Sequence, residues 1–352
     1  MRRLFAALTL VLGCLALPVA AQGVPPSDPT VASESAIGSW AEPQIRVVVA
    51  RGLMGGSLAT FRPDGLLTRG ELAELVADLS QPDTASASPS ASSSRAVTIA
   101  GLDARLVRAL GLTAAANRFV TAARDAGLTP PSRFGTEVVA RLLGLRTNHL
   151  VPHDDLELLP GDAATRAEGA FSAARLLALR SADLQAIRTA AGSLQLPELE
   201  EWQRRVLDVA VGLIGFPYVW GGSSERAQMP FGIRAPGGFD CSGFVWRVYK
   251  LESYGEGGAL ATTLKGRTTY AMSGEVPKAL RVPFARLQPA DVVFFGARGA
   301  KSKPDQIDHM GVYVGDGWFI HSSESGVALA PLAGWHRPRF AWARRPLAEA
   351  GL

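Results

Sequence analysis

The second half of the chain is built around the segment Phe239-Asp240-Cys241-Ser242-Gly243-Phe244-Val245-Trp246-Arg247-Val248-Tyr249. Its apolar residues at 244, 245, 248 and 249 recur at helical spacing, which predicts a helix with Cys241 at its start and on its inward side. First-turn N–H groups and the positive end of the helix dipole favour a thiolate, the nucleophilic form of cysteine. The segment therefore predicts an acidic, reactive thiol, with an inert buried thiol as the alternative.

The N-terminus predicts export. Residues 1–21 begin with Met1-Arg2-Arg3, continue with an apolar run and reach Val19-Ala20-Ala21, as in a secretory signal peptide. Val11-Leu12-Gly13-Cys14 also resembles a lipoprotein box, so lipidation at Cys14 stays open. No later stretch is long and apolar enough to span a bilayer. Signal cleavage leaves one cysteine, which excludes an internal disulfide.

Composition excludes some classes of protein. The chain has 352 residues, of which 47% are apolar, enough for two or three folded domains. Its net charge of +4 suits an anionic environment such as a wall polymer. Because basic and acidic residues are interspersed and form no concentrated basic stripe, we expect no nucleic-acid partner.

Residues 37–80 predict a helix–loop–helix, with Thr68 and Glu71 at capping-box spacing. Four short segments of this unit together resemble the S-layer homology motif. They are, in order, Trp40-Ala41-Glu42, Gly52 to Gly56, Phe61 to Asp64 and Leu67 to Glu71. This resemblance implies that Arg69 helps to bind an anionic secondary wall polysaccharide. A solvated first-turn arginine is the alternative.

Residues 81–96 are rich in Ser, Ala and Pro and predict a linker. Residues 97–192 predict one or two degenerate copies of the same motif, since Thr165 to Glu168 repeats the capping box. Arg166 would then be a second polymer contact, unless this copy is structural only. His149 and His153 are expected to be loop residues without a catalytic part.

Residues 197–348 predict a further domain, in which two β segments flank Gly315-Asp316-Gly317. A three-residue connection would pair Val314 with Trp318 and place His309 and His321 diagonally on one face. A two-residue connection would place them on opposite faces.

A nucleophilic thiol needs a base, and the base needs a group that orients it. Cys241, His309 and His321 are the right types for these three roles. His336 is expected at the surface. The same cysteine and two histidines could instead be zinc ligands, although the sequence shows no fourth ligand.

Four motifs of this domain occur in a fixed order. They are Pro217 to Gly222, Asp240 to Phe244, Asp308 to Val314 and, last, His321. Together they resemble the NlpC/p60 cysteine peptidases of bacterial cell walls. The resemblance covers about residues 199–345. It implies an α+β, papain-like fold, with N-terminal helices packed on an antiparallel sheet, behind a mostly helical S-layer-homology-like region. We expect a flexible association between the two parts.

The family resemblance also implies a function. Cys241 would attack the γ-D-glutamyl–diamino-acid bond of peptidoglycan stem peptides and form a thioester, with His309 as base and His321 as orienter. Tyr218 would help to hold the oxyanion. The resemblance also implies that Asp240, Ser242 and Trp220 bind substrate. The alternative role for Asp240 is to cap the helix that begins at Cys241.

No cofactor or metal is implied, and the protein would be secreted and associated with the cell wall. Two other functions remain open. The same triad serves an N-acetylmuramoyl-L-alanine amidase or an acyltransferase, and the chain could also be an inactive wall-binding protein.

Overall fold

The computed structural model describes residues 35–80 and 93–352. The expected signal peptide, Cys14 and residues 81–92 of the expected linker lie outside the described residues. Within the described part of the chain, no helix has the length and apolarity needed to cross a membrane.

The helical region, residues 35–80 and 93–193, contains seven α-helices. They are α1 (Glu42–Ala50), α2 (Arg69–Ser80), α3 (Ile99–Ala109), α4 (Thr113–Asp125), α5 (Phe134–Leu142), α6 (Arg166–Ala178) and α7 (Ser181–Ser193). Each described helix of this region buries one apolar stripe in a shared core, as in Ile45 and Val48 of α1 or Leu102 and Leu106 of α3.

Three short segments of the helical region close a ring of backbone hydrogen bonds. The Leu67 N–H donates to the Ala164 carbonyl (2.8 Å), the Ala164 N–H to the Val97 carbonyl (2.7 Å), and the Val97 N–H to the Leu67 carbonyl (2.9 Å). Two segments of the degenerate region therefore repeat the geometry of the first motif, at Val97 and at Ala164.

A threonine follows each of these three positions and caps the next helix. The Thr68 hydroxyl accepts from the Glu71 N–H (3.2 Å), and the Glu71 carboxylate accepts from the Thr68 N–H (2.9 Å), which confirms the first predicted capping box. Thr165 makes only half of the second box, because the Glu168 carboxylate binds Arg146 instead (2.8 Å).

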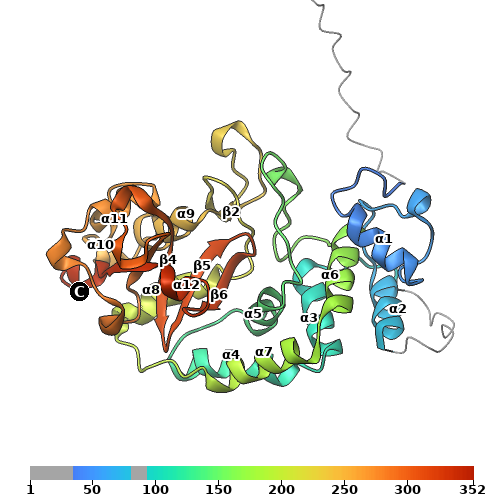
Figure 1. The fold of residues 1–352 in the computed structure, drawn as a ribbon, viewed down its shortest axis with the longest axis horizontal. Helices are drawn as coiled ribbons and strands as arrows, with labels where there is room; N and C mark the ends of the chain where they lie inside the picture. The colour runs from blue at the N-terminus through green and yellow to red at the C-terminus, as the bar shows by residue number, and fades with distance from the viewer. Residues whose placement is uncertain (1–34, 81–92) are drawn as a thin grey trace, which may run out of the picture. The chain divides into compact units, whose positions relative to one another are not determined.

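The C-terminal region, residues 197–352, is built on a five-stranded antiparallel sheet with the order β6-β5-β4-β3-β7 (Figure 1). Its strands are β3 (Val292–Gly296), β4 (Ile307–Gly315), β5 (Trp318–Ser323), β6 (Gly326–Pro331) and β7 (Phe340–Arg344). A two-stranded sheet joins β1 (Ser223–Ser224) to β2 (Gly238–Phe239).

The helices of this region are α8 (Glu201–Gly212), α9 (Cys241–Trp246), α10 (Leu260–Thr263), α11 (Thr269–Gly274), α12 (His336–Arg339) and α13 (Pro346–Glu349). Helix α9 packs on β4 and β5, and it continues as a π-helical turn over Arg247–Leu251. The predicted α+β class is confirmed, with helices packed on an antiparallel sheet behind a mostly helical region.

The β4–β5 hairpin differs from its prediction at one point. Strand β5 begins opposite Gly315, so the connection is the two residues Asp316 and Gly317, both with positive φ, as in a type I′ turn. The ladder then skips Val314, and this bulge restores the expected pairs of Val312 with Ile320 and of Tyr313 with Phe319. The connection is therefore the two-residue alternative, but the bulge places His309 and His321 on one face, as expected for the three-residue alternative.

The helical and C-terminal regions are joined by many contacts, contrary to the expected flexible association. Arg141 of α5 donates to the carbonyls of Gly215 (2.6 Å) and Ser325, and α5 lies against β6. Arg133 donates to the Gly212 carbonyl (2.7 Å), and the Thr129 N–H donates to the Asp208 carboxylate (2.7 Å). Because several of these groups are buried, separating the regions would expose unpaired polar groups.

Candidate active site

Cys241 is the first residue of α9, as predicted, and Asp240 is the N-cap. The Asp240 carboxylate accepts from the Gly243 N–H (2.5 Å) and from the Gly221 N–H (2.9 Å). The helix-capping alternative for Asp240 is therefore confirmed, because both of its oxygens are engaged in holding the helix start. Only 9% of Cys241 is exposed, and this residue lines a cleft.

The thiol is not acidic in this structure, which corrects the sequence-based prediction. Burial, assisted by the nearby Asp240 carboxylate, raises the pKa of Cys241 to about 12. The N–H groups of Ser242 and Met310 and the charge of Arg267 lower the pKa, but by less than burial raises it. Cys241 is thus a neutral thiol that needs a base to become a nucleophile.

The two predicted imidazoles lie side by side. His309 Nε2 and His321 Nδ1 are 2.8 Å apart, and the rings meet edge to face with centroids 4.9 Å apart. Gly311 makes this possible, since a Cβ there would lie 2.6 Å from the Ile320 carbonyl oxygen and 3.0 Å from the His321 Cβ. His309 and His321 line the same cleft as Cys241.

Burial keeps both rings neutral. It lowers the pKa of His309 to about 4, assisted by the nearby His336 and Arg339, and it lowers the pKa of His321 well below its ordinary value. A neutral imidazole has a free lone pair and can accept a proton from a thiol.

The low pKa of His309 predicts a pH-dependent stability. The unfolded chain binds a proton at this residue below pH about 6.5, whereas the folded protein does so only near pH 4, so stability falls as the pH falls through this window. Between pH 7 and pH 5, wild type should lose about 2 kcal/mol more unfolding free energy than His309→Gln. Urea unfolding at both pH values measures this difference.

The control is His153→Gln, which removes an exposed histidine. Buried carboxyls such as Asp103 and Glu157, whose pKa values burial raises, have the opposite pH dependence. They are present in every variant and cancel in the comparison. Equal losses in wild type and His309→Gln would contradict a neutral buried His309.

His336 is not the isolated surface residue that the sequence suggests. Its ring centroid lies 5.1 Å from that of His321 and 6.3 Å from that of His309, in contact with Phe319. The segment Trp335–Arg339 comes from a loop between β6 and β7, and no periodicity in the sequence connects it with the hairpin.

Arg267 is a residue that the sequence analysis missed. Its guanidinium donates to the Ser242 hydroxyl (2.7 Å), to the Asp240 carboxylate (3.2 Å) and to the carbonyls of Gly221 and Gly222 (3.1 Å each). Ser242 is buried, and its hydroxyl also contacts Asp240 (2.9 Å). Ser242 therefore holds the helix start in place, and its predicted role as a substrate contact is not supported by these contacts.

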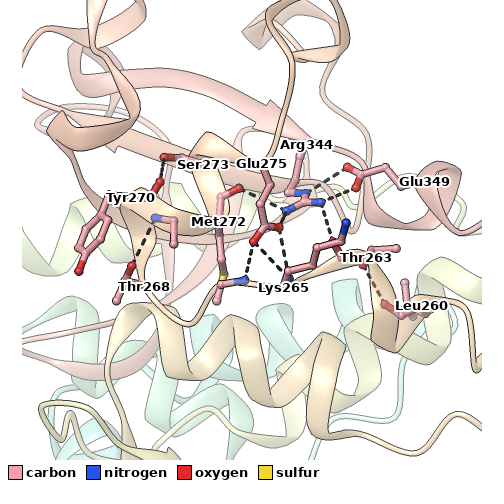
Figure 2. Close-up of polar contacts among 12 residues, drawn as sticks. Leu260, Thr263, Lys265, Thr268, Tyr270, Met272, Ser273, Glu275, Arg344 and Glu349 are labelled. Carbon is pink, nitrogen blue, oxygen red and sulfur yellow. Dashed lines mark hydrogen bonds and ion pairs between the residues drawn. The ribbon is translucent and has the colours of Figure 1, made fainter.

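Figure 2 shows how the segment that carries Arg267 is fixed. The Glu275 carboxylate accepts from the N–H groups of Lys265 (3.2 Å) and Gly266 (2.5 Å) and pairs with Arg344 of β7 (2.8 Å). Arg344 also binds the Thr263 carbonyl (3.0 Å) and Glu349. The buried guanidinium of Arg344 thus joins α10, α11 and α13 to the edge of the sheet.

Tyr218 and Trp220 both line the cleft that contains the thiol. Tyr218 is half-buried in the cleft, and burial together with the nearby Cys241 and Asp240 raises its pKa, so its hydroxyl remains a proton donor. The Trp220 side chain is exposed on the rim of the cleft.

The cleft has a volume of about 1140 Å³ and is lined by both regions of the chain. Its rim carries six large apolar residues that are exposed to solvent: Leu150, Val151, Trp220, Phe231, Tyr270 and Trp335. Such side chains are usually buried, so their concentration here marks a binding surface.

One wall of the cleft comes from the helical region, at residues 148–151, where the sequence predicts only a loop without a catalytic part. The Asn148 side chain donates to the Tyr218 carbonyl (3.3 Å), and the His149 ring packs edge to face on Trp40 with centroids 4.6 Å apart. Leu150 is 83% and Val151 46% exposed.

Of the two arginines predicted to bind a wall polymer, only Arg69 is exposed. Arg166 is buried: it donates to the Phe61 carbonyl (2.8 Å), the Met54 carbonyl (2.8 Å) and the Glu71 carboxylate. Its guanidinium is used in joining α6 to the first motif, so the prediction of a polymer contact at Arg166 is wrong.

Comparisons with known proteins agree with these motifs. The model of the "NlpC/P60 family" matches residues 215–344, and that of the "S-layer homology domain" matches residues 35–73. The "Probable peptidoglycan endopeptidase LytE" of Bacillus subtilis (strain 168) is 32% identical over 142 residues, which are 40% of this chain and 34% of that protein.

The names of two further relatives refer to cleavage of different peptide bonds. The "Murein DD-endopeptidase MepH" of Escherichia coli (strain K12) is 37% identical over 113 residues, 32% of this chain and 33% of that protein. The "Gamma-D-glutamyl-L-lysine dipeptidyl-peptidase" of Bacillus subtilis (strain 168) is 29% identical over 127 residues, 35% and 33% of the two chains. The chain thus spans about a third of the length of these relatives.

The matched ranges contain the motif around Arg69 and all the residues of the Cys241–His309–His321 arrangement. The chain therefore carries an S-layer homology domain at residues 35–73 and, at residues 215–344, a domain of the NlpC/P60 family.

Proposed function

We propose that this protein is a secreted, wall-associated cysteine peptidase that hydrolyses the γ-D-glutamyl–diamino-acid bond of peptidoglycan stem peptides. The observation that carries the proposal is that the neutral Cys241 thiol and the hydrogen-bonded His309–His321 pair line one open cleft. The names of the relatives, peptidoglycan endopeptidases among them, support a peptidoglycan substrate.

Catalysis begins with proton transfer. His309 takes the thiol proton as Cys241 Sγ attacks the carbonyl carbon of the scissile amide, which gives a tetrahedral intermediate and an imidazolium. The Cys241 N–H and the Tyr218 hydroxyl would stabilise the oxyanion. His309 then gives its proton to the leaving amine, and a thioester remains.

The second half of the reaction uses the same groups. His309 takes a proton from water, the resulting hydroxide attacks the thioester carbon, and the carboxylic acid leaves while the proton returns to the Cys241 sulfur. Through its contact with His309 Nε2, His321 fixes the tautomer and orientation of the base and stabilises the imidazolium.

The bond that is cleaved is tested by mass spectrometry of muropeptides released from purified peptidoglycan, with Cys241→Ala as the blank. The proposed cleavage leaves L-alanyl-γ-D-glutamate on the glycan side and a fragment that begins at the diamino acid. A product that begins at L-alanine would identify an amidase. Resolution of cross-linked dimers without cleavage within the stem would identify a D,D-endopeptidase.

The exposed rim predicts that Leu150 of the helical region contacts substrate. Leu150→Asp should lower kcat/KM for a stem-peptide substrate by about tenfold, chiefly through KM, because a charged side chain replaces apolar contact area. The measurement is steady-state kinetics on a synthetic stem peptide.

The matched control is Leu280→Asp, which changes another leucine, 66% exposed, outside the cleft. Alkylation of Cys241 by iodoacetamide should proceed at the wild-type rate in both variants, since neither touches the thiol. If Leu150→Asp and Leu280→Asp gave the same KM, the wall at residues 148–151 would have no part in substrate binding.

We further propose that the S-layer homology domain attaches the enzyme to an anionic wall polysaccharide through Arg69. Arg69→Ala should bind purified walls about tenfold more weakly in a sedimentation assay, because a charge-assisted hydrogen bond is lost. Arg51→Ala, which removes another exposed arginine of this domain, should bind like wild type. If Arg69→Ala and Arg51→Ala bound the walls equally well, Arg69 would have no part in attachment.

A further inference from the structure

Three of the five histidines in the sequence meet in the cleft. His309, His321 and His336 each have one ring nitrogen within 4.8 Å of those of the other two. His309 and His321 are used in the proposed reaction, whereas nothing in that reaction requires His336. The chemistry of three converging imidazoles is that of a transition-metal site, since neutral imidazole is a strong ligand for Zn²⁺.

We propose that His309, His321 and His336 bind one Zn²⁺ ion reversibly, and that the bound ion switches the hydrolase off. The inhibitory part of this proposal rests on the proposed function, but binding itself does not. Because the ligand set contains the base and its orienter, metal binding and catalysis exclude each other.

The geometry needs only small movements. Zinc–nitrogen distances of about 2.0–2.1 Å in a tetrahedral site place two ligand nitrogens roughly 3.3 Å apart. His309 Nε2 and His321 Nδ1 are 2.8 Å apart, so their rings must separate by about half an ångström. The proton that they share moves to the other nitrogen of its ring, so no net charge is created on the protein.

His336 can close the third side of the site. It begins the four-residue helix α12, is half-buried, and follows the exposed Trp335, so its ring can rotate toward the pair. The His336 ring lies near the Pro331 carbonyl, which can accept from one ring N–H and so leave the second ring nitrogen with a free lone pair. Metal-bound histidines commonly have such a carbonyl partner.

The surroundings leave one coordination position open to the cleft. Phe295 and Phe319 pack on the imidazoles from the sheet side. Asp308 and Arg339, which flank His309, neutralise each other through a hydrogen-bonded ion pair (2.6 Å). A water molecule from the cleft can therefore complete a three-histidine site without Cys241 as a ligand.

The consequence for the enzyme follows from the lone pair on His309. In the proposed reaction His309 Nε2–H donates to His321 Nδ1, and the thiol proton goes to the lone pair on His309 Nδ1. When zinc binds Nε2, the ring proton moves to Nδ1, so no lone pair is left for the thiol proton, and the neighbouring cation disfavours the imidazolium that the reaction needs. Zinc would thus prevent activation of the thiol without occupying it.

Calorimetric titration of the EDTA-dialysed full chain with ZnCl₂ tests binding without any activity. We expect one ion per chain, binding at least tenfold weaker in His336→Gln, and wild-type affinity in the control His153→Gln. Cys241→Ser should bind within about threefold of wild type. Wild-type affinity in His336→Gln, or loss of binding in Cys241→Ser, would overturn the proposed ligand set.

Inhibition is then measured as muropeptide release at increasing free zinc, each variant being compared with its own rate in EDTA. Half-inhibition should require at least tenfold more zinc in His336→Gln than in wild type. If zinc bound as expected while wild type released no muropeptide even in EDTA, the proposed function would fail and the metal site would stand. If zinc bound to an active enzyme without inhibiting it, the switch would be refuted.

Discussion

Cys241→Ala is expected to abolish hydrolysis of peptidoglycan, with a loss of about 10⁴-fold or more in kcat. The sulfur is the atom that would form the thioester, and no other residue in the cleft can replace it, because Cys241 is the one cysteine outside the predicted signal peptide. The measurement is the rate of muropeptide release by purified enzyme.

Two controls separate lost chemistry from lost structure. Cys241 is 9% exposed, and alanine is only slightly smaller than cysteine, so the alanine variant should keep the fold. An unchanged midpoint of urea unfolding would show this. His309→Gln keeps the thiol but removes the base, and should lose about 10²- to 10⁴-fold. Substantial release by Cys241→Ala would show that the reaction does not pass through the sulfur.

The sequence predicted the parts of the site that local patterns encode. Cys241 at a helix start, His309 and His321 on one hairpin, and Tyr218 and Trp220 in the preceding motif all lie in short segments whose periodicity or order is visible. Whether the two imidazoles share a face depended on a bulge at Val314, and a bulge leaves no signal in alternation alone.

What the sequence did not reveal depends on contacts between distant segments. Arg267, His336 and the 148–151 wall approach Cys241 from three separate parts of the chain, and no spacing rule connects them. The acidity of the thiol was predicted from the helix start, but it is decided by burial, which depends on the whole fold. For the same reason Arg166, although placed like Arg69 in its motif, is a buried structural residue.

Arg141→Ala is expected to give the largest loss of stability, about 3–5 kcal/mol, because it removes the cation from a buried ion pair. Arg141 Nε lies 3.5 Å from the Glu137 carboxylate, and both side chains are almost fully buried. The substitution would leave that carboxylate in the interior without this partner, and it would also leave the Gly215 and Ser325 carbonyls without their donor.

The loss should appear in a particular way, because Arg141 joins the two regions. Gly215 precedes the Tyr218 motif and Ser325 lies in the β5–β6 turn, so these bonds hold α5 against the wall of the cleft. Urea unfolding of wild type should be a single transition, whereas Arg141→Ala should unfold at lower urea, with the helical and C-terminal regions separating first.

The matched control is Arg180→Ala, which removes an exposed arginine whose partner, Asp183, lies on the same helix turn. Solvent screens that pair, so its loss should leave the unfolding curve unchanged. If Arg141→Ala were as stable as Arg180→Ala, the buried Glu137–Arg141 pair would not stabilise the contact between the helical and C-terminal regions. The result would instead favour two loosely tethered regions, as the sequence predicts.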